Sequence, residues 1–169
     1  GLSVRSSLDT STQSIADLSL KTGLLEYDKR NGYRGVVGNN KNKSWFEKYI
    51  EKDQPHNFFL AKVIKFDELK GRVDLEVLKG KNIVQGHLSN FNWARKSLGN
   101  GYLGPKINKA NEVFSLHDII HVSFNGENFY NLEQIPKING AIIVMDPHTG
   151  RVFALSGGFD FNESNFNRA

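Results

Sequence analysis

Residues 139–169 read NGAIIVMDPHTGRVFALSGGFDFNESNFNRA, and this stretch decides the fold of the chain. Two apolar runs, 141–145 and 152–155, flank the sequence Asp146-Pro147-His148-Thr149-Gly150. Pro147 presets φ for a turn, the Asp146 carboxylate can accept backbone N–H bonds, and Gly150 tolerates a positive φ. The pattern therefore predicts a β-hairpin with a short loop. Neither run alternates between apolar and polar residues, so we expect both strands to be covered on both faces within a larger sheet.

A helix is predicted near the N-terminus. Thr10-Ser11-Thr12-Gln13 has the form of a capping box, in which the Thr10 hydroxyl and the Gln13 side chain bond each other's backbone N–H groups. The helix should run to about Arg30 and stop at Gly32 in a left-handed conformation. Its predicted apolar face contains Ile15, Leu18, Leu20, Leu24, Leu25 and Tyr27.

Two further features are predicted in the same region. Residues 3–8 form a short strand candidate, with Val4 and Leu8 as its apolar anchors. Gly23 lies inside the predicted helix, where glycine costs about 1 kcal/mol relative to alanine. This cost predicts close packing at Gly23.

The middle of the chain is predicted to be mostly strand. A linker rich in Gly, Asn and Lys over residues 35–43 precedes a short helix at 44–50, whose Trp45, Phe46 and Tyr49 have helical spacing. Five strands follow, at residues 58–66, 72–77, 83–88, 119–124 and 128–132, with a long irregular connection over 89–116. Asn125-Gly126 predicts a two-residue type I′ turn, which would place Val122 opposite Phe129. Three strands, a long connection and two strands fit an OB-fold barrel, although an SH3-like barrel gives a similar count.

The chain resembles the class A penicillin-binding proteins, the bifunctional peptidoglycan synthases. In the C-terminal part the matching residues are Gly140-Ala141, Val144-Met145-Asp146-Pro147, Thr149-Gly150-Arg151-Val152, Ala154-Leu155, Gly157-Gly158, Asp160-Phe161 and Phe166-Asn167-Arg168-Ala169. This stretch resembles the opening hairpin of the family's transpeptidase domain. Val4 to Thr10 with Gln13, and then Tyr27 to Gly35, resemble the first strand, the first helix and the following loop of the same domain.

The resemblance extends into the middle section. Members of the 1A type carry an OB-like domain just before the transpeptidase hairpin, and Trp93-Ala94-Arg95 and Glu133-Gln134-Ile135-Pro136 match that pattern. The expected fold class is α+β and mostly β, with a five-stranded OB-like barrel inserted into a partial transpeptidase sheet. The expected domains are residues 1–35, the inserted barrel at 36–135, and the hairpin with its truncated continuation at 136–169.

The sequence lacks the motifs that transpeptidation requires. The family supplies Ser-x-x-Lys, then Ser-x-Asn, then Lys-Thr-Gly, because a serine nucleophile needs a lysine to deprotonate it and an oxyanion hole. No Ser-x-x-Lys occurs in the 169 residues, and the resemblance implies that it follows shortly after Ala169. Lys21-Thr22-Gly23 and Ser123-Phe124-Asn125 spell the other two motifs, but in the wrong order and context. We interpret both as coincidences and expect no catalytic residue in this chain.

Metal and cofactor sites are also not expected. His117 and His121 are four residues apart, but on a strand such residues lie about 13 Å apart, so they are interpreted as partly exposed strand histidines. His148 is interpreted as a solvated turn residue, and Asp74 and Glu76 as the wet side of a strand. The sequence has no cysteine, which excludes disulfides and thiolate sites.

Single-stranded nucleic-acid binding is the alternative function, because OB-folds bind single strands through aromatic side chains and a basic groove. The available aromatics are Phe58, Phe66, Phe91, Trp93, Phe114, Phe129 and Tyr130. The net charge of +4 is small, however, and the basic residues are scattered along the chain. Aromatic residues on the strands of a small barrel are usually core, so this function is not favoured.

The resemblance implies a protein anchored in the cytoplasmic membrane and acting outside it, which polymerises lipid-linked glycan and cross-links peptides. It implies contact with peptidoglycan or its precursors through the whole enzyme. The barrel is expected to be an interaction, regulatory or spacer module, for which an outer-membrane lipoprotein activator is a possible partner. We expect this part of the chain to be non-catalytic, to bind no nucleic acid and to make no membrane contact of its own.

Overall fold

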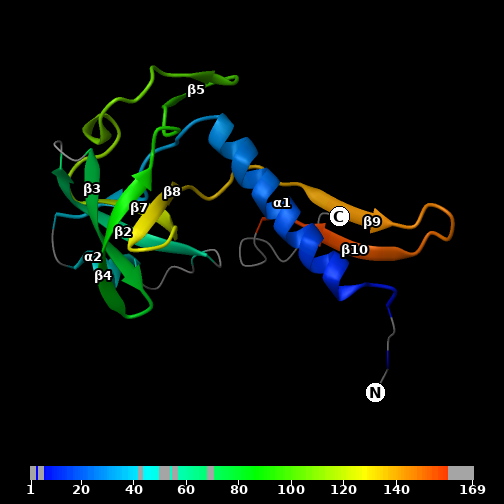
Figure 1. Ribbon diagram of the computed structural model, residues 1–169. Helices are drawn as coiled ribbons and strands as arrows, with labels where there is room; N and C mark the ends of the chain where they lie inside the picture. Colours follow the sequence, from blue (N-terminus) through cyan, green and yellow to red (C-terminus); the bar gives the residue numbers. More distant parts are fainter. Residues whose placement is uncertain are drawn as a thin grey trace. The chain divides into compact units, whose positions relative to one another are not determined.

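The computed structural model describes residues 3, 6–41, 44–49, 54, 57–67 and 71–159. The chain is mostly strand, with few helices (Figure 1). It divides into two compact units: Gly1–Asp28 together with Pro136–Ala169, and Lys29–Ile135. Among the described residues, no helix has the length and apolar character needed to cross a membrane.

The second unit contains a closed five-stranded barrel, as predicted. Its strands are β2 (Phe58–Asp67), β3 (Arg72–Lys79), β4 (Asn82–Asn90), β7 (Asp118–Phe124) and β8 (Phe129–Glu133). They pair in the order β7-β2-β3-β4-β8, and β8 pairs with β7 to close the barrel. The β4–β8 pair is parallel and the others are antiparallel. A three-stranded meander followed by a hairpin whose last strand pairs in parallel with the third is the OB-fold arrangement.

Alternate residues of the strands fill the barrel. On β3, Val73, Leu75 and Val77 are fully buried, while Asp74 and Glu76 between them are partly exposed. Ala61, Val63, Ile120, Val122 and Leu132 complete the interior from the other strands. Burying each such side chain contributes about 1.5–3 kcal/mol. The clean alternation of residues 72–77 thus specified which side of β3 faces the core.

A short helix, α2 (Trp45–Tyr49), covers the outer side of part of the barrel. Trp45 and Tyr49 are buried against Leu60, Leu78 and Ile119, which form a second core cluster. The helix predicted at 44–50 is therefore present, although the side chain of Phe46 and all of Ile50 lie outside the described residues. A two-residue strand, β1 (Gly38–Asn39), pairs with β7 beside it.

The connection from β4 to β7 was predicted to be irregular but contains short regular elements. They are β5 (Ser97–Gly99), β6 (Tyr102–Leu103) and the 3₁₀ helix η1 (Ala110–Glu112). Phe91 and Phe114 anchor the two ends of this connection in the barrel core, with their ring centroids 6.2 Å apart. The connection is therefore fixed at both ends against the barrel.

The β7–β8 hairpin differs from the prediction. Val122 pairs with Leu132, not with Phe129, and Phe124 pairs with Tyr130. The loop is longer than the predicted Asn125-Gly126 turn, because Glu127 and Asn128 also lie between the strands, both at positive φ. The Asn125 N–H donates to the Phe129 carbonyl at 2.8 Å, and the Phe129 N–H donates to the Gly126 carbonyl at 2.8 Å. Asparagine tolerates this conformation better than most residues, so the chain turns later than the Asn-Gly pair suggested.

The first unit contains helix α1 (Thr10–Arg30) up to Asp28, and a hairpin of β9 (Ala141–Met145) and β10 (Val152–Gly157). The predicted turn is present. The Gly150 N–H donates to the Asp146 carbonyl at 2.9 Å with Gly150 at φ +70°, and the Asp146 carboxylate accepts bonds from the His148 N–H and the Thr149 hydroxyl. Leu20 and Leu24 of α1 approach Gly140 closely, so the helix lies along the hairpin (Figure 1).

The residues before α1 lie beside β10. The Asp9 N–H donates to the Phe153 carbonyl at 2.9 Å, and the Ser7 hydroxyl donates to the Val152 carbonyl at 2.7 Å. The head and the tail of the chain therefore belong to one unit. The predicted strand at 3–8 is not formed in the described residues Ser3 and 6–8, and its anchor Val4 lies outside them.

Three local predictions about α1 are wrong. The N-cap is Asp9, not Thr10: the Asp9 carboxylate accepts bonds from the Thr12 N–H and the Ser11 and Thr12 hydroxyls. Gly23 is exposed, and a methyl group there would meet nothing within 4 Å, so no close packing occurs at that point. The buried stripe is Ala16, Leu20, Leu24 and Asp28, whereas Ile15, Leu18 and Tyr27 are exposed.

The hairpin was expected to be covered on both faces, and within the described residues it is not. Ile143 and Met145 of β9 are more than half exposed, while Ile142 and Val144, which alternate with them, are partly buried. Ile15 and Leu18 on α1 are exposed as well. The first unit thus keeps apolar surface on both elements.

Candidate binding face of the barrel

The two tripeptides that spell transpeptidase motifs have local structural roles. Lys21-Thr22-Gly23 lies on the exposed side of α1. In Ser123-Phe124-Asn125, the Ser123 hydroxyl donates to Glu133 Oε1 at 2.8 Å, and Asn125 opens the β7–β8 loop. Among the described residues, the Ser123 hydroxyl is bonded to a glutamate and not to a lysine, and Lys21 forms no salt bridge.

The histidines have separate surroundings. His121 Nε2 lies 2.7 Å from Gln54 Oε1, and His117, just before β7, has a positive φ of 71°. His148 is exposed in the β9–β10 turn. No group of three or more histidine or acidic side chains suited to hold a metal ion occurs among the described residues.

Asp74 and Glu76 are each paired with a basic group on the outer side of the barrel, and not with one another. Asp74 Oδ1 lies 3.0 Å from Arg72 Nε and 3.0 Å from His87 Nδ1. Glu76 lies 3.9 Å from the ammonium of Lys62. The interpretation of these carboxylates as the wet side of a strand agrees with this placement. The outer side of β3 and β4 therefore carries a polar network of Arg72, Asp74 and His87.

The aromatic side chains divide into buried and exposed groups. Phe58, Phe91, Phe114 and Tyr130 are buried, as expected for barrel strands and the segments packed on them. Phe124 and Phe129 are exposed, and the Phe129 ring centroid lies 5.6 Å from that of His87. At this end of the barrel, Lys79 Nζ lies 4.6 Å from the centre of the Phe124 ring and 5.4 Å from that of Tyr130. Lys79 and these rings close the barrel end through cation–π contacts.

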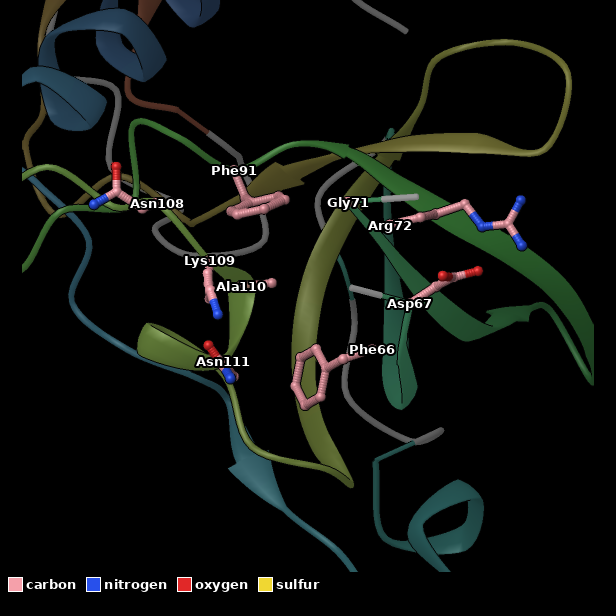
Figure 2. Close-up of a pocket in the computed structure, with 9 residues that line it drawn as sticks. All are labelled: Phe66, Asp67, Gly71, Arg72, Phe91, Asn108, Lys109, Ala110 and Asn111. Carbon is pink, nitrogen blue, oxygen red and sulfur yellow. The ribbon is translucent and has the colours of Figure 1, made fainter. Parts of the chain in front are cut away.

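A pocket of about 280 Å³ lies where β2 and β3 meet the β4–β7 connection (Figure 2). It is lined by Phe66, Asp67, Gly71, Arg72, Phe91, Asn108, Lys109, Ala110 and Asn111. The rings of Phe66 and Phe91 lie on two sides of it. The polar ends of Asp67 and Arg72 lie on one side in this view, and those of Lys109 and Asn111 on the other.

The pocket wall at residues 108–111 is held in place by the core. Lys109 is extended (φ −132°, ψ 146°), and the chain then turns through η1. The Val113 and Phe114 N–H groups both donate to the Ala110 carbonyl, at 3.0 and 2.9 Å, and Phe114 is only 2% exposed. The anchored Phe114 therefore fixes Lys109 and Asn111 at the pocket.

Sequence reasoning missed this pocket. The sequence presents Phe66 and Phe91 only as aromatics available for binding, and no motif in it marks Asn108, Lys109 or Asn111. The residues come from three segments separated by long stretches of sequence. The available signal was Asn108-Lys109-Ala110-Asn111, a polar run between Pro105 and the apolar Val113-Phe114 in the long connection.

Comparison with known proteins shows the family. Residues 33–138 match the family model of the penicillin-binding protein OB-like domain. Along its length the chain is 31% identical to penicillin-binding protein 1A of Rickettsia prowazekii and 28% identical to penicillin-binding protein 1A of Escherichia coli, covering 99% and 100% of this chain. In each case the match spans 20% of the relative, so the chain corresponds to about a fifth of these proteins.

A solved structure has the same fold. The crystal structure of penicillin-binding protein 1A from Haemophilus influenzae superposes with a TM-score of 0.63 at 22% identity, over 96% of this chain and 23% of that one. The barrel and the 33–138 match define an OB-like domain of the penicillin-binding proteins, and the chain belongs to that family. Its matches outside the barrel place it among the 1A-type members.

Proposed function

We propose that this chain is a non-catalytic part of a bifunctional peptidoglycan synthase. Its first unit would be the leading edge of the transpeptidase domain, and its barrel an interaction, regulatory or spacer module. The observation that carries the proposal is the similarity to penicillin-binding protein 1A along 99% of the chain. The whole enzyme would be anchored in the cytoplasmic membrane, act outside it, and perform glycan polymerisation and peptide cross-linking.

The absence of Ser-x-x-Lys supports a non-catalytic part, because acylation by penicillin requires that serine. The exposed apolar residues Ile15, Leu18, Ile143 and Met145 also support it, because a larger domain would cover them. A fluorescent penicillin incubated with this chain should give no covalent band. The whole enzyme should give a band under the same conditions. A penicillin adduct on this chain alone would overturn the proposal.

The role of the barrel is tested in the whole enzyme. Residues 36–135 would be replaced by a flexible linker in one variant and by an unrelated small barrel in another. An interaction module predicts that both variants keep basal synthesis and lose stimulation by an outer-membrane lipoprotein activator. A spacer predicts that the unrelated barrel restores what the linker loses. Full, normally stimulated synthesis with the linker alone would contradict both roles.

The nucleic-acid alternative predicts a different result. An OB domain that binds single strands would be retained on single-stranded DNA and released as salt increases. We expect no retention at moderate salt, because Phe58, Phe114 and Tyr130 are buried and unable to stack on bases.

A further inference from the structure

The pocket lined by Phe66, Phe91, Asn108, Lys109 and Asn111 has a chemistry suited to a sugar. We propose that it is a glycan subsite for an acetamido sugar that carries a carboxylate. The proposal goes beyond the function proposed above, because it assigns a ligand to the barrel itself. It rests on the residues of this pocket only.

The two rings provide the apolar contact. Phe66 and Phe91 border the hollow on different sides (Figure 2), and Phe91 is 9% exposed and packed on Phe114, so its position is fixed. The axial C–H face of a pyranose is apolar and packs on flat aromatic rings. The volume of about 280 Å³ is close to the lower end of the range of small-molecule sites, about 300–1,000 Å³. The pocket thus suits a ligand of one or two rings.

The polar groups provide the specificity. Asn108 and Asn111 each carry an amide with two donors and an acceptor, which can pair with hydroxyl and acetamido groups. Within the described part of the chain, no carboxylate forms a salt bridge with the Lys109 ammonium. Arg72, on the other side, is already held by Asp74 at 3.0 Å. Lys109 is therefore the cation available to a ligand carboxylate.

Other ligand classes fit this pocket less well. A nucleic acid requires several phosphate contacts. Lys109 and Arg72 are the basic residues in the described lining of this pocket, and Arg72 is already paired with Asp74. An extended peptide commonly adds to an open strand edge. Along the pocket β3 offers no edge, because it pairs with both β2 and β4. β2 pairs with β7 only over residues 58–62, and the glutamate dipeptide in the test below probes for peptide binding beside Phe66.

The described borders of the pocket have defined positions. Gly71, at φ +58°, turns the chain into β3 at one border, and the anchored Phe114 fixes residues 108–111 at the other. Binding groups that are already fixed lose little conformational entropy when a ligand binds. This favours measurable affinity even for a small ligand of one or two sugar rings.

The test is an NMR titration of this chain with N-acetylglucosaminyl-N-acetylmuramic acid, which carries acetamido groups and a carboxylate. We expect chemical-shift changes centred on Phe66, Phe91 and residues 108–111. Chitobiose, which lacks the carboxylate, should bind about threefold to tenfold more weakly, because an exposed ion pair contributes little energy. A glutamate dipeptide, which has carboxylates but no sugar ring, should not perturb these residues.

Variants separate the pocket from general surface effects. Lys109→Ala and Asn111→Ala change exposed side chains and should weaken disaccharide binding, each by about threefold to tenfold. In Lys109→Ala, the preference for the disaccharide over chitobiose should disappear. Lys81→Ala, an exposed lysine in the β3–β4 turn, is the matched control and should bind normally.

Three results would overturn the proposal. They are no shift at the pocket, shifts centred elsewhere, or equal shifts with the glutamate dipeptide. Penicillin labelling of the whole enzyme does not depend on this pocket, so failure of the sugar titration and failure of the proposed function are distinguishable.

Discussion

The side-chain amide of Gln13 on α1 pairs with the backbone of Leu155 on β10 in the manner of a neighbouring strand. Gln13 Nε2 donates to the Leu155 carbonyl at 3.0 Å, and the Leu155 N–H donates to Gln13 Oε1 at 3.0 Å. The two residues are 142 positions apart. Since β10 pairs only with β9 among the described strands, this amide occupies part of its open edge. The first helix and the last described strand are thereby joined by two hydrogen bonds between a side chain and the backbone.

Gln13→Ala should loosen the first unit. It removes both bonds and leaves the half-buried N–H and carbonyl of Leu155 without a protein partner, which costs about 1–3 kcal/mol. We expect faster hydrogen exchange at the Leu155 amide and a lower free energy of unfolding of this unit. Ser14→Ala is the control, because the exposed Ser14 hydroxyl bonds only the Thr10 carbonyl one turn earlier. Unchanged exchange at Leu155 in Gln13→Ala would show that the pairing is not formed in solution.

Gly86→Ala should destabilise the barrel. A methyl group at Gly86 on β4 would lie 2.5 Å from Cε2 of Tyr130, whose ring is fully buried and unable to move without repacking the core. Overpacking of this kind costs about 1–3 kcal/mol. Denaturant unfolding should show the loss. Gly104→Ala, where the nearest atom would lie at 3.5 Å, should be tolerated. Equal stability of the two variants would contradict the close approach of β4 and Tyr130.

Gly23→Ala should stabilise α1. Gly23 is exposed and helical, and an added methyl group would meet nothing within 4 Å. Replacing glycine by alanine inside a helix gains about 0.5–1 kcal/mol. Amide exchange along α1 should slow. Gly150→Ala in the β9–β10 turn should have the opposite effect on the hairpin, because Gly150 has a φ of +70°. A loss of stability in Gly23→Ala would indicate that Gly23 is closely packed in solution, as the sequence predicted.

The barrel could be predicted because its strands carry strong local signals. Residues 72–77 alternate, and the structure buries Val73, Leu75 and Val77 while exposing the residues between them. The Asp146–Gly150 turn was predictable for the same reason: each residue has a specific preference for its turn position. Patterns within a few residues thus specified both the strands and this turn.

Features that depend on residues far apart in the sequence could not be predicted from local patterns. The local sequence predicts a capping box at Gln13, but the side chain of Gln13 bonds the backbone of β10, and Asp9 caps the helix instead. The spacing of Ile15 and Leu18 predicts a broader apolar face on α1 than the structure buries, because among the described residues nothing covers these two side chains. The pocket was missed because Phe66, Phe91 and Lys109 meet only after the barrel closes.

Asp9 should make the start of α1 sensitive to acid. Its carboxylate accepts hydrogen bonds from the Ser11 hydroxyl and from the N–H and hydroxyl of Thr12, and these bonds lower the pKa of Asp9 from 3.8 to about 2. Because the folded pKa lies below the unfolded one, the carboxylate stabilises the helix fully above about pH 4. That contribution is lost as the pH falls through about 2. An NMR titration should place the Asp9 midpoint near 2, well below that of an unperturbed carboxyl.

Asp9→Asn isolates the charge from the cap. The amide oxygen of asparagine can still accept a bond from the Thr12 N–H, but the residue does not titrate. Exchange of the Thr12 amide should therefore accelerate between pH 4 and pH 2 in the wild-type chain, relative to the intrinsic rate, and show no such step in Asp9→Asn. Asp9→Ala should lose protection at every pH, because it removes the acceptor altogether. If Asp9 titrates at its ordinary value and all three proteins exchange alike, Thr10 rather than Asp9 caps the helix in solution.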